Sequence, residues 1–137
     1  MSAFTGSLLI EEIVPGKLWR LVSPIRYAVG SVDSSLVVTV PSGFVTDGTS
    51  IPYFLRVFLA VWGTYGRASA VHDYLYYAIR KNEQNDVLGN GNTASRRKIA
   101  DEIFLEAMTV LKTGKILRTL LYWSVRIFGW VRTRKPL

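Results

Sequence analysis

The chain contains a single histidine, His72, in the run Ala-Val-His-Asp-Tyr-Leu-Tyr-Tyr, where Asp73 follows it directly. Imidazole is the side chain best suited to acid–base chemistry near neutral pH. The surrounding residues are strongly apolar, and Val71, Leu75 and Ile79 recur at the spacing of a helical stripe. The histidine is therefore expected beside the core, where it acts as a general base or forms a satisfied buried polar contact.

A second candidate, Asp101, lies in the run Lys-Ile-Ala-Asp-Glu-Ile-Phe. It is flanked by apolar positions and does not share the outer charged face with Arg97 and Glu102. If this segment packs as a helix antiparallel to the helix of His72, a carboxylate oxygen comes within about 2.6–3.2 Å of a ring nitrogen. Such a carboxylate orients a general base, but the same pair is equally a satisfied buried polar contact.

The third candidate, Asp47, lies in the turn-rich stretch Gly-Phe-Val-Thr-Asp-Gly-Thr-Ser-Ile-Pro. This stretch offers a carboxylate, hydroxyls and backbone amides within a few residues. In one interpretation it is a tight turn, in which Asp47 caps nearby amides and Gly48 supplies a positive φ. In the other, Asp47 converges with His72 and Asp101 as a third catalytic residue.

Metal and cofactor chemistry is restricted by composition, because the chain has no cysteine and one histidine. Thiolate zinc sites, iron–sulfur clusters, cysteine nucleophiles and sites with several imidazoles are excluded. The remaining oxygen donors suit Ca²⁺ or Mg²⁺ rather than zinc. We therefore expect no cofactor and no tightly bound transition metal, with Asp73 and Asp47 as the ligands if an ion binds.

The elements that must position these residues are predicted to form one α+β domain of 137 residues. Residues 1–46 are mainly short β runs separated by turn residues, which predicts a small antiparallel sheet. Residues 52–131 are mainly helical in pattern, and 132–137 form a basic tail. The predicted strands are Ser7–Ile13, Lys17–Ser23, Ile25–Val29, Leu36–Val40 and Phe44–Thr46, and the predicted helices are Arg67–Lys81, Arg96–Leu111 and Lys115–Val131.

The net charge of +7 comes entirely from the C-terminal part of the chain. Residues 1–111 contain ten basic and ten acidic residues, whereas the seven basic residues from Lys112 to Lys135 have no acidic neighbour in that stretch. The body therefore has no basic excess, and no sequence-specific nucleic-acid partner is expected. A basic end fits phosphates, anionic lipid or an acidic protein, and charge alone does not choose among them.

The last predicted helix has an apolar face and an opposite basic face on a helical wheel. The apolar face consists of Ile116, Leu120, Trp123, Ile127, Trp130 and Val131, and the basic face consists of Lys115, Arg118 and Arg126. In the simplest interpretation the apolar face is core and the basic face is solvated. Because the apolar face is wider than a small sheet needs, we expect Leu120 and Ile127 to pack on the domain and Trp130 to contact a partner chain. The tail residues expected to join that contact are Arg132, Arg134 and Lys135.

Five ordered motifs resemble a phage and prophage family, the domain of unknown function 1353 family. They are FVTDGTSIP, a Gly-Arg-Ala step, AVHDYLYYAIR, RRKIADEIFLEAM and YWSVRIFG, and they run from about Pro41 to Gly129. The resemblance implies a small phage-encoded protein from a late or structural gene neighbourhood. The first functional expectation is therefore a virion-associated tail or baseplate protein that binds other phage structural proteins and resides in the virion or the host cytoplasm.

A further resemblance concerns His-Asp-x-x-Tyr followed by Ala-Asp-x-x-Phe, which is similar to the helix core of bacterial-type secreted phospholipases A2. In that family the histidine activates water, the adjacent aspartate and loop carbonyls bind calcium, and the second aspartate orients the histidine. The resemblance implies these roles for His72, Asp73 and Asp101, with Tyr76 at the matching tyrosine. The family's inter-helix cysteines and Gly-rich calcium loop are absent, so Asp47 would serve in the loop's place. The alternative function is a metal-assisted envelope hydrolase with Ca²⁺ as cofactor.

A third interpretation is a membrane- or nucleic-acid-binding protein that acts through the basic C-terminal helix. The N-terminus lacks a basic start followed by an apolar run, so no signal peptide is expected. The most hydrophobic stretch, Ile116–Val131, is interrupted by Arg118 and Arg126 and is too short for a confident membrane span. A membrane surface is therefore a more plausible contact than a membrane crossing.

Overall fold

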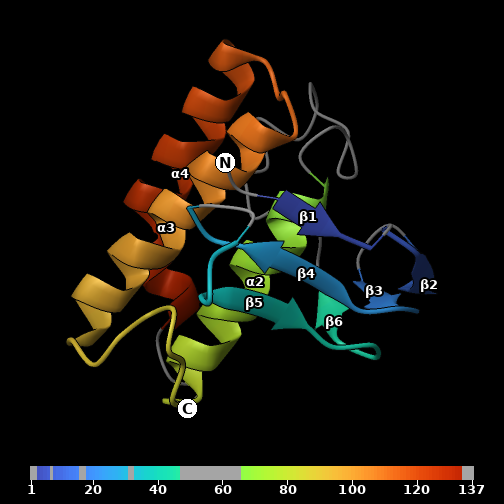
Figure 1. The fold of residues 1–137 in the computed structure, drawn as a ribbon, viewed down its shortest axis with the longest axis horizontal. Helices are drawn as coiled ribbons and strands as arrows, with labels where there is room; N and C mark the ends of the chain where they lie inside the picture. The colour runs from blue at the N-terminus through green and yellow to red at the C-terminus, as the bar shows by residue number, and fades with distance from the viewer. Residues whose placement is uncertain (1–2, 7, 16–17, 31–32, 47–65, 134–137) are drawn as a thin grey trace.

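The computed structural model describes residues 3–6, 8–15, 18–30, 33–46 and 66–133. Within these ranges, strands occupy the N-terminal part and helices the C-terminal part, which confirms the predicted α+β class (Figure 1). The strands are β1 (Ala3–Thr5), β2 (Ile10–Val14), β3 (Leu18–Leu21), β4 (Ile25–Ala28), β5 (Val37–Val40) and β6 (Val45–Thr46), and the helices are α2 (Gly66–Arg80), α3 (Thr93–Val110) and α4 (Lys115–Thr133).

The strands form two three-stranded antiparallel sheets where the sequence predicted a single sheet. Their strand orders are β1–β4–β5 and β2–β3–β6. The first sheet includes β1, a three-residue strand too short to leave a periodic signal in the sequence. The change of sheet falls between Leu21 and Ile25, around Pro24, whose nitrogen has no hydrogen to donate to a continuous ladder.

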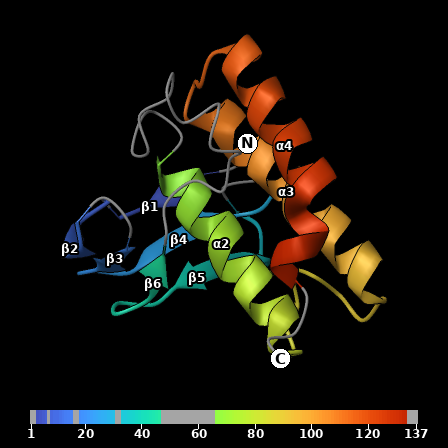
Figure 2. The ribbon, with the colours of Figure 1, turned by 180° about the vertical axis from the view of Figure 1, so that it is seen from behind.

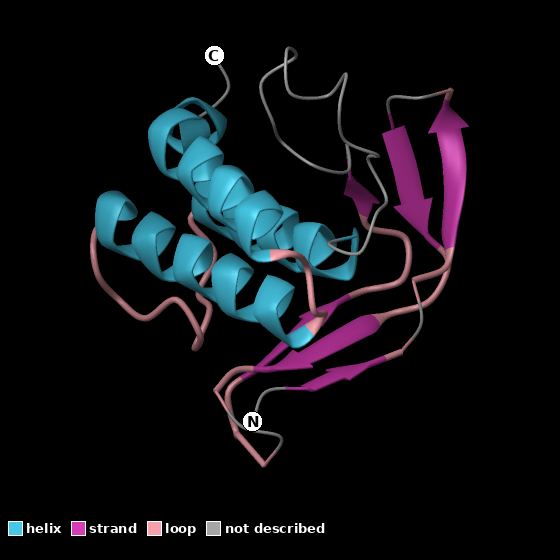
Figure 3. Ribbon diagram, turned by 90° about the horizontal axis from the view of Figure 1, so that it is seen from above, coloured by secondary structure: helices cyan, strands magenta, loops and turns pink. Residues whose placement is uncertain are grey.

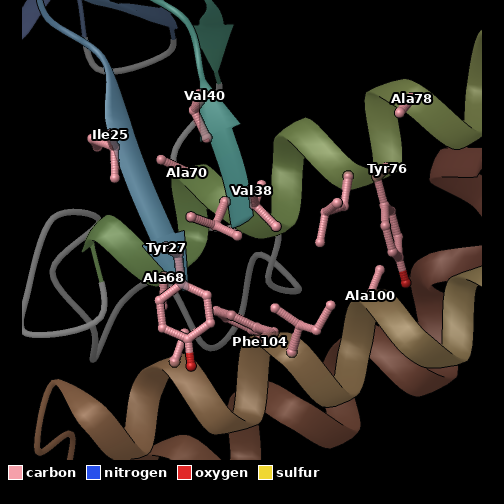
Figure 4. Packing of buried hydrophobic residues seen from close by; sticks show 14 of the residues in the cluster. Ile25, Tyr27, Val38, Val40, Ala68, Ala70, Tyr76, Ala78, Ala100 and Phe104 are labelled. Atoms are coloured by element: carbon pink, nitrogen blue, oxygen red, sulfur yellow. The ribbon is translucent and has the colours of Figure 1, made fainter. Parts of the chain in front are cut away.

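One face of the β1–β4–β5 sheet is buried and forms one side of the hydrophobic core. Residues in β4 and β5 alternate between buried and exposed positions, as expected for a strand with one covered face. The buried set is Ile25, Tyr27, Val38 and Val40, and Figure 4 shows Val38 and Val40 on the α2 side and Tyr27 extending toward Phe104 of α3. The hydrophobic pattern of these strands therefore places α2 over the sheet.

The helix α2 is central, because it packs on the sheet and also on the other two helices that the structure describes. Figure 3 shows the helices gathered on one side of the strands, and Figure 2 shows α3 and α4 beyond α2. Eleven of its 15 residues are buried, and small residues such as Ala68, Ala70 and Ala78 allow close approach of its neighbours. A helix covered on several sides must satisfy its polar side chains internally, and α2 carries His72 and Asp73.

The helices α3 and α4 return along α2 in alternating directions (Figures 1 and 2). Asn92 caps α3, because its side chain accepts a hydrogen bond of 2.8 Å from the backbone N–H of Ser95. At the other end, Lys112 adopts a left-handed conformation (φ 60°). The following N–H, from Thr113, bonds back to the carbonyl of Met108 at 2.9 Å. This tight end turns the chain directly into α4.

The sheet is tied to α3 by a polar contact between Tyr27 and Glu106. The Tyr27 hydroxyl is fully buried with its ring and donates to Glu106 Oε1 at 2.5 Å. The backbone N–H of Gly30 donates to the same oxygen at 3.0 Å. One carboxylate thus connects the β4–β5 hairpin to the helical layer.

We expect Glu106→Ala to lower the free energy of unfolding by about 1.5–3 kcal/mol, because it removes the charged acceptor of these two hydrogen bonds. The measurement is urea unfolding at pH 7. Glu102→Ala on the exposed side of α3 is the matched control and should stay within about 0.5 kcal/mol of the parent. Equal losses for the two variants would contradict the assigned role of Glu106.

Candidate functional site

A buried carboxylate, Asp101 of α3, is the centre of a polar cluster drawn from all three described helices. Its Oδ1 lies 2.7 Å from Nε2 of His72 and accepts a hydrogen bond of 2.5 Å from the Tyr76 hydroxyl. Its Oδ2 accepts a hydrogen bond of 2.8 Å from Nη1 of Arg126. Asp101 has 0% exposure. These four residues are named the Asp101 network below.

Local helix geometry explains why these side chains meet. His72 and Tyr76 are four residues apart on α2, so they project from the same face, one turn apart. On α3, Asp101 follows Ala100, whose small buried side chain lets the two helices approach. Arg126 comes from α4, which packs against both α2 and α3. One short helix spacing and three contacts between residues 25 or more positions apart therefore build the network.

The imidazole of His72 is held between two aromatic rings. The Tyr76 ring lies with its centroid 4.2 Å away at 43°, and the Phe104 ring lies 4.7 Å away at 30°. His72 is only 3% exposed. This enclosure fixes the plane of the imidazole, so its nitrogens point in defined directions.

The partners of Asp101 define the protonation pattern of the network. An ionised carboxylate only accepts hydrogen bonds, so a neutral His72 facing it carries its proton on Nε2. In that tautomer the lone pair of His72 is on Nδ1. The positive charge of Arg126 balances the negative charge of Asp101, so the imidazole need not be protonated for the cluster to be neutral.

The pKa values of two residues of the network are shifted from their ordinary values. Burial, together with the negative charge of Asp101 and the hydrogen bond to it, raises the pKa of Tyr76 far above its ordinary value of 10.0. Burial alone would lower the pKa of Arg126, but the hydrogen bond and the charge of Asp101 outweigh it and raise that pKa. Tyr76 therefore remains a neutral donor and Arg126 a cationic one across the physiological range.

The contact predicted between His72 and Asp101 is confirmed by their 2.7 Å separation. Asp47, which the sequence analysis placed beside them, lies outside the described residues. The catalytic roles assigned to these three residues remain predictions. The geometry is that of a carboxylate-oriented imidazole, whose function the contact alone does not determine.

Asp73, the candidate metal ligand of α2, is buried at 8% exposure. Within the part of the chain that the structure describes, no three His, Asp or Glu side chains gather as a metal site would require. The calcium site suggested by the phospholipase resemblance would also include Asp47, which lies outside the described residues. The ligand role of Asp73 remains a prediction, and no chemical step is derived through a metal.

The predicted orientation of the last helix is wrong. Leu120 and Ile127, expected to pack on the domain, are 46% and 58% exposed. The helix instead buries Leu121 and Val125, and it directs Arg126, assigned to the solvated face, onto Asp101. The physical reason is that one rotation of the helix both buries Leu121 and Val125 and lets Arg126 reach Asp101, whereas the helical wheel took account only of the more hydrophobic face.

The structure does not describe the side chains of the predicted partner-binding residues. Trp130 and Arg132 belong to α4, but their side chains are not described. Arg134 and Lys135 lie beyond the described residues. The expected contact with a partner chain therefore remains a prediction.

The sequence analysis did not identify Arg126 and Tyr76 as hydrogen-bond partners of Asp101. A sequence signal for Arg126 existed: a buried aspartate flanked by apolar residues demands a cation, and few basic residues lie on faces near the core. Tyr76 was implied only through the phospholipase resemblance. Neither signal specified the bonds that the structure shows.

Fold and site together define an α+β protein whose three described helices share one buried His–Asp–Tyr–Arg network. The chain belongs to the family described as protein of unknown function DUF1353, whose family model matches residues 19–125. His72, Tyr76 and Asp101 fall inside the matched range, and Arg126 follows its last residue directly. No curated protein and no solved structure gives a significant match.

We expect Asp101→Asn to lower the free energy of unfolding by about 1.5–3 kcal/mol, because it removes the charged acceptor of Tyr76 and the counter-ion of the partly exposed Arg126. Urea unfolding at pH 7 measures the loss. Asp86→Asn, in an exposed loop position, is the matched control and should change stability by less than about 0.5 kcal/mol. A loss under about 1 kcal/mol for Asp101→Asn would show that the ion pair adds little.

The contribution of Tyr76 to the free energy of unfolding should depend on pH in the alkaline range. Its pKa is raised in the folded state, so its contribution is complete below about pH 10 and declines as the unfolded tyrosine ionises above that value. The stability advantage of the parent over Tyr76→Phe should therefore shrink above pH 10, by up to about 1.4 kcal/mol per pH unit. Urea unfolding of both proteins between about pH 8 and 11.5 tests this. A constant difference across that range would contradict it.

Proposed function

We propose that this chain is a hydrolase of carboxylic esters in which His72 activates water. The observation that carries the proposal is the 2.7 Å contact between His72 Nε2 and Asp101 Oδ1 inside a water-poor cluster. A carboxylate on one ring nitrogen leaves the other nitrogen as the base, which is the arrangement of a general-base dyad. The hydroxyl of Tyr76 on the same carboxylate adds to the resemblance with the phospholipase helix core.

The proposed reaction adds one water across one ester bond. Nδ1 of His72 accepts a proton from the water as its oxygen attacks the carbonyl carbon of the ester. The tetrahedral intermediate then collapses, and the Nδ1 proton passes to the departing alkoxide. The products are a carboxylic acid and an alcohol, and the imidazole returns to its starting form. The negative charge of Asp101 stabilises the imidazolium that exists between these two proton transfers.

Tyr76 and Arg126 act as positioning residues in this proposal. Each bonds to a different oxygen of Asp101, so the carboxylate cannot rotate away from the imidazole. The aromatic rings of Tyr76 and Phe104 prevent the imidazole itself from tilting. The dyad is thus held in place by residues that need not touch the substrate.

A second candidate function is that of a virion-associated tail or baseplate protein, in which the same network is purely structural. The observation that favours it is that both oxygens of Asp101 have donors and that His72 is only 3% exposed. A cluster completed by protein groups stabilises the fold without any ligand. The two candidates differ in whether water and an ester reach Nδ1.

The rate of ester hydrolysis by the His72→Gln variant distinguishes the two candidate functions. We expect the parent protein to release fatty acid from phospholipid vesicles or to cleave a soluble aryl ester, and the variant to be slower by about 10²–10⁴-fold. Circular dichroism at the assay temperature must show that the variant remains folded. Phe44→Leu, in the sheet-side aromatic group remote in sequence from the network, serves as a folded control with activity near that of the parent.

The pH dependence provides a second readout, since a base that must be neutral gives a rate that rises through its own titration. A parent protein with no hydrolysis of either substrate between about pH 5 and 9, with and without added calcium, would overturn the hydrolase proposal. Detection of the chain in purified phage particles by mass spectrometry would then support the virion role.

A further inference from the structure

One face of α4 presents a continuous row of large apolar side chains to solvent. The row consists of Ile116, Leu120, Trp123 and Ile127, spaced four, three and four residues apart. Their exposures are 79%, 46%, 56% and 58%, respectively. This row is named the α4 stripe. Single exposed apolar residues are common on protein surfaces, but a contiguous row along one helix indicates a binding surface.

The α4 stripe lies on the side of the helix opposite its packed face. Leu121 and Val125 are buried against the core at 0% and 3% exposure. Arg126 is drawn toward Asp101, and Arg118 bonds to the carbonyl of Thr113 at 3.0 Å. Since the helix is already anchored by these contacts, burial of the stripe by rotation would break the ion pair with Asp101.

Every charged residue in the chain segment that contains the α4 stripe is basic. From Lys112 to Lys135 the chain has seven basic residues and no acidic one. Within the described residues, Lys112 and Lys115 are exposed near the N-terminal end of the stripe. The sequence places three more cations, Arg132, Arg134 and Lys135, after its C-terminal end. An apolar row with cations at both ends fits a surface that is apolar inside and negative at its boundary.

We propose that the α4 stripe docks on an anionic phospholipid bilayer, with the helix lying along the membrane surface. Isoleucine and leucine side chains enter the acyl boundary, Trp123 occupies the interface, and the flanking cations contact lipid phosphates. No helix among the described residues is long and apolar enough to cross a membrane. The helix therefore lies on the bilayer, held by its apolar row and its charge together.

Charge also argues against a second copy of the chain as the occupant. Two α4 stripes packed face to face, in either direction, would bring the basic end of one helix against a basic end of the other. Like charges placed together oppose such pairing. An anionic lipid surface removes this repulsion and supplies the complementary charge at both ends.

This inference stands apart from the proposed hydrolase activity, because the four residues of the stripe are not members of the Asp101 network. Vesicle binding needs no ester cleavage. His72→Gln protein should therefore bind vesicles as the parent does, so loss of one property leaves the other testable.

Co-sedimentation of the full chain with vesicles tests the proposal. We expect binding to vesicles that contain phosphatidylglycerol and phosphatidylethanolamine, and much weaker binding to phosphatidylcholine alone. Leu120→Ser combined with Ile127→Ser should weaken binding to the anionic vesicles by about tenfold or more. Part of the parent's binding should survive high salt, because apolar contacts are not screened.

Val22→Ser combined with Val37→Ser is the matched control, since both side chains are similarly exposed (56% and 41%) but lie on the strand side of the molecule. This control should bind anionic vesicles within about twofold of the parent. Equal binding by the α4 double variant and the parent would overturn the proposal, as would equal binding to phosphatidylcholine vesicles. A dimer that the α4 substitutions dissociate, without any vesicle binding, would assign the stripe to self-association instead.

Discussion

The buried negative charge of Asp101 is the constraint on which the helical half of this protein depends. A carboxylate with no exposure to water loses several kcal/mol of hydration, which must be replaced by donors within the protein. The donors come from two helices, with His72 and Tyr76 on α2 and Arg126 on α4. Because each donor must reach a particular oxygen, the charge specifies how α2, α3 and α4 sit relative to one another. Apolar packing alone would tolerate several rotations of the same helices.

The position of α4 is consistent with that requirement. With Arg126 bonded to Asp101, the helix turns its Leu121–Val125 side to the core and leaves the α4 stripe in solvent. The ion pair and the exposed apolar row are thus two results of one helix rotation. An interior that holds a charged network and a surface suited to a membrane are linked through the same 19-residue element. This link connects the proposed site to the proposed docking surface without requiring that they act in one reaction.

The Asp101 network has the properties that both candidate functions require. For a hydrolase it supplies a fixed imidazole, a carboxylate that stabilises the imidazolium, and two groups that hold the carboxylate. For a structural protein it supplies a satisfied polar centre that selects one helix arrangement. The distinguishing atom is Nδ1 of His72, which does not face Asp101 when Nε2 does. Membership in the DUF1353 family places the chain among relatives of unknown function, so this chemistry has to be decided by experiment.

Short-range patterns in the sequence were sufficient for the α+β class, the three described helices and the meeting of His72 with Asp101. Helical periodicity sets which residues of one helix share a face, and a polar residue on an apolar face must find a polar partner nearby. The two-sheet arrangement, the short strand β1 and the partner of the second Asp101 oxygen were decided by tertiary structure. The same holds for the rotation of α4, where the wheel of residues 115–131 favours burial of Leu120 and Ile127. A hydrophobicity pattern describes the residues of one helix only. The ion pair, in contrast, joins two helices through residues that are 25 positions apart in the sequence. Only the folded chain brings that carboxylate and guanidinium together, and their contact forms in the same helix orientation that buries Leu121 and Val125.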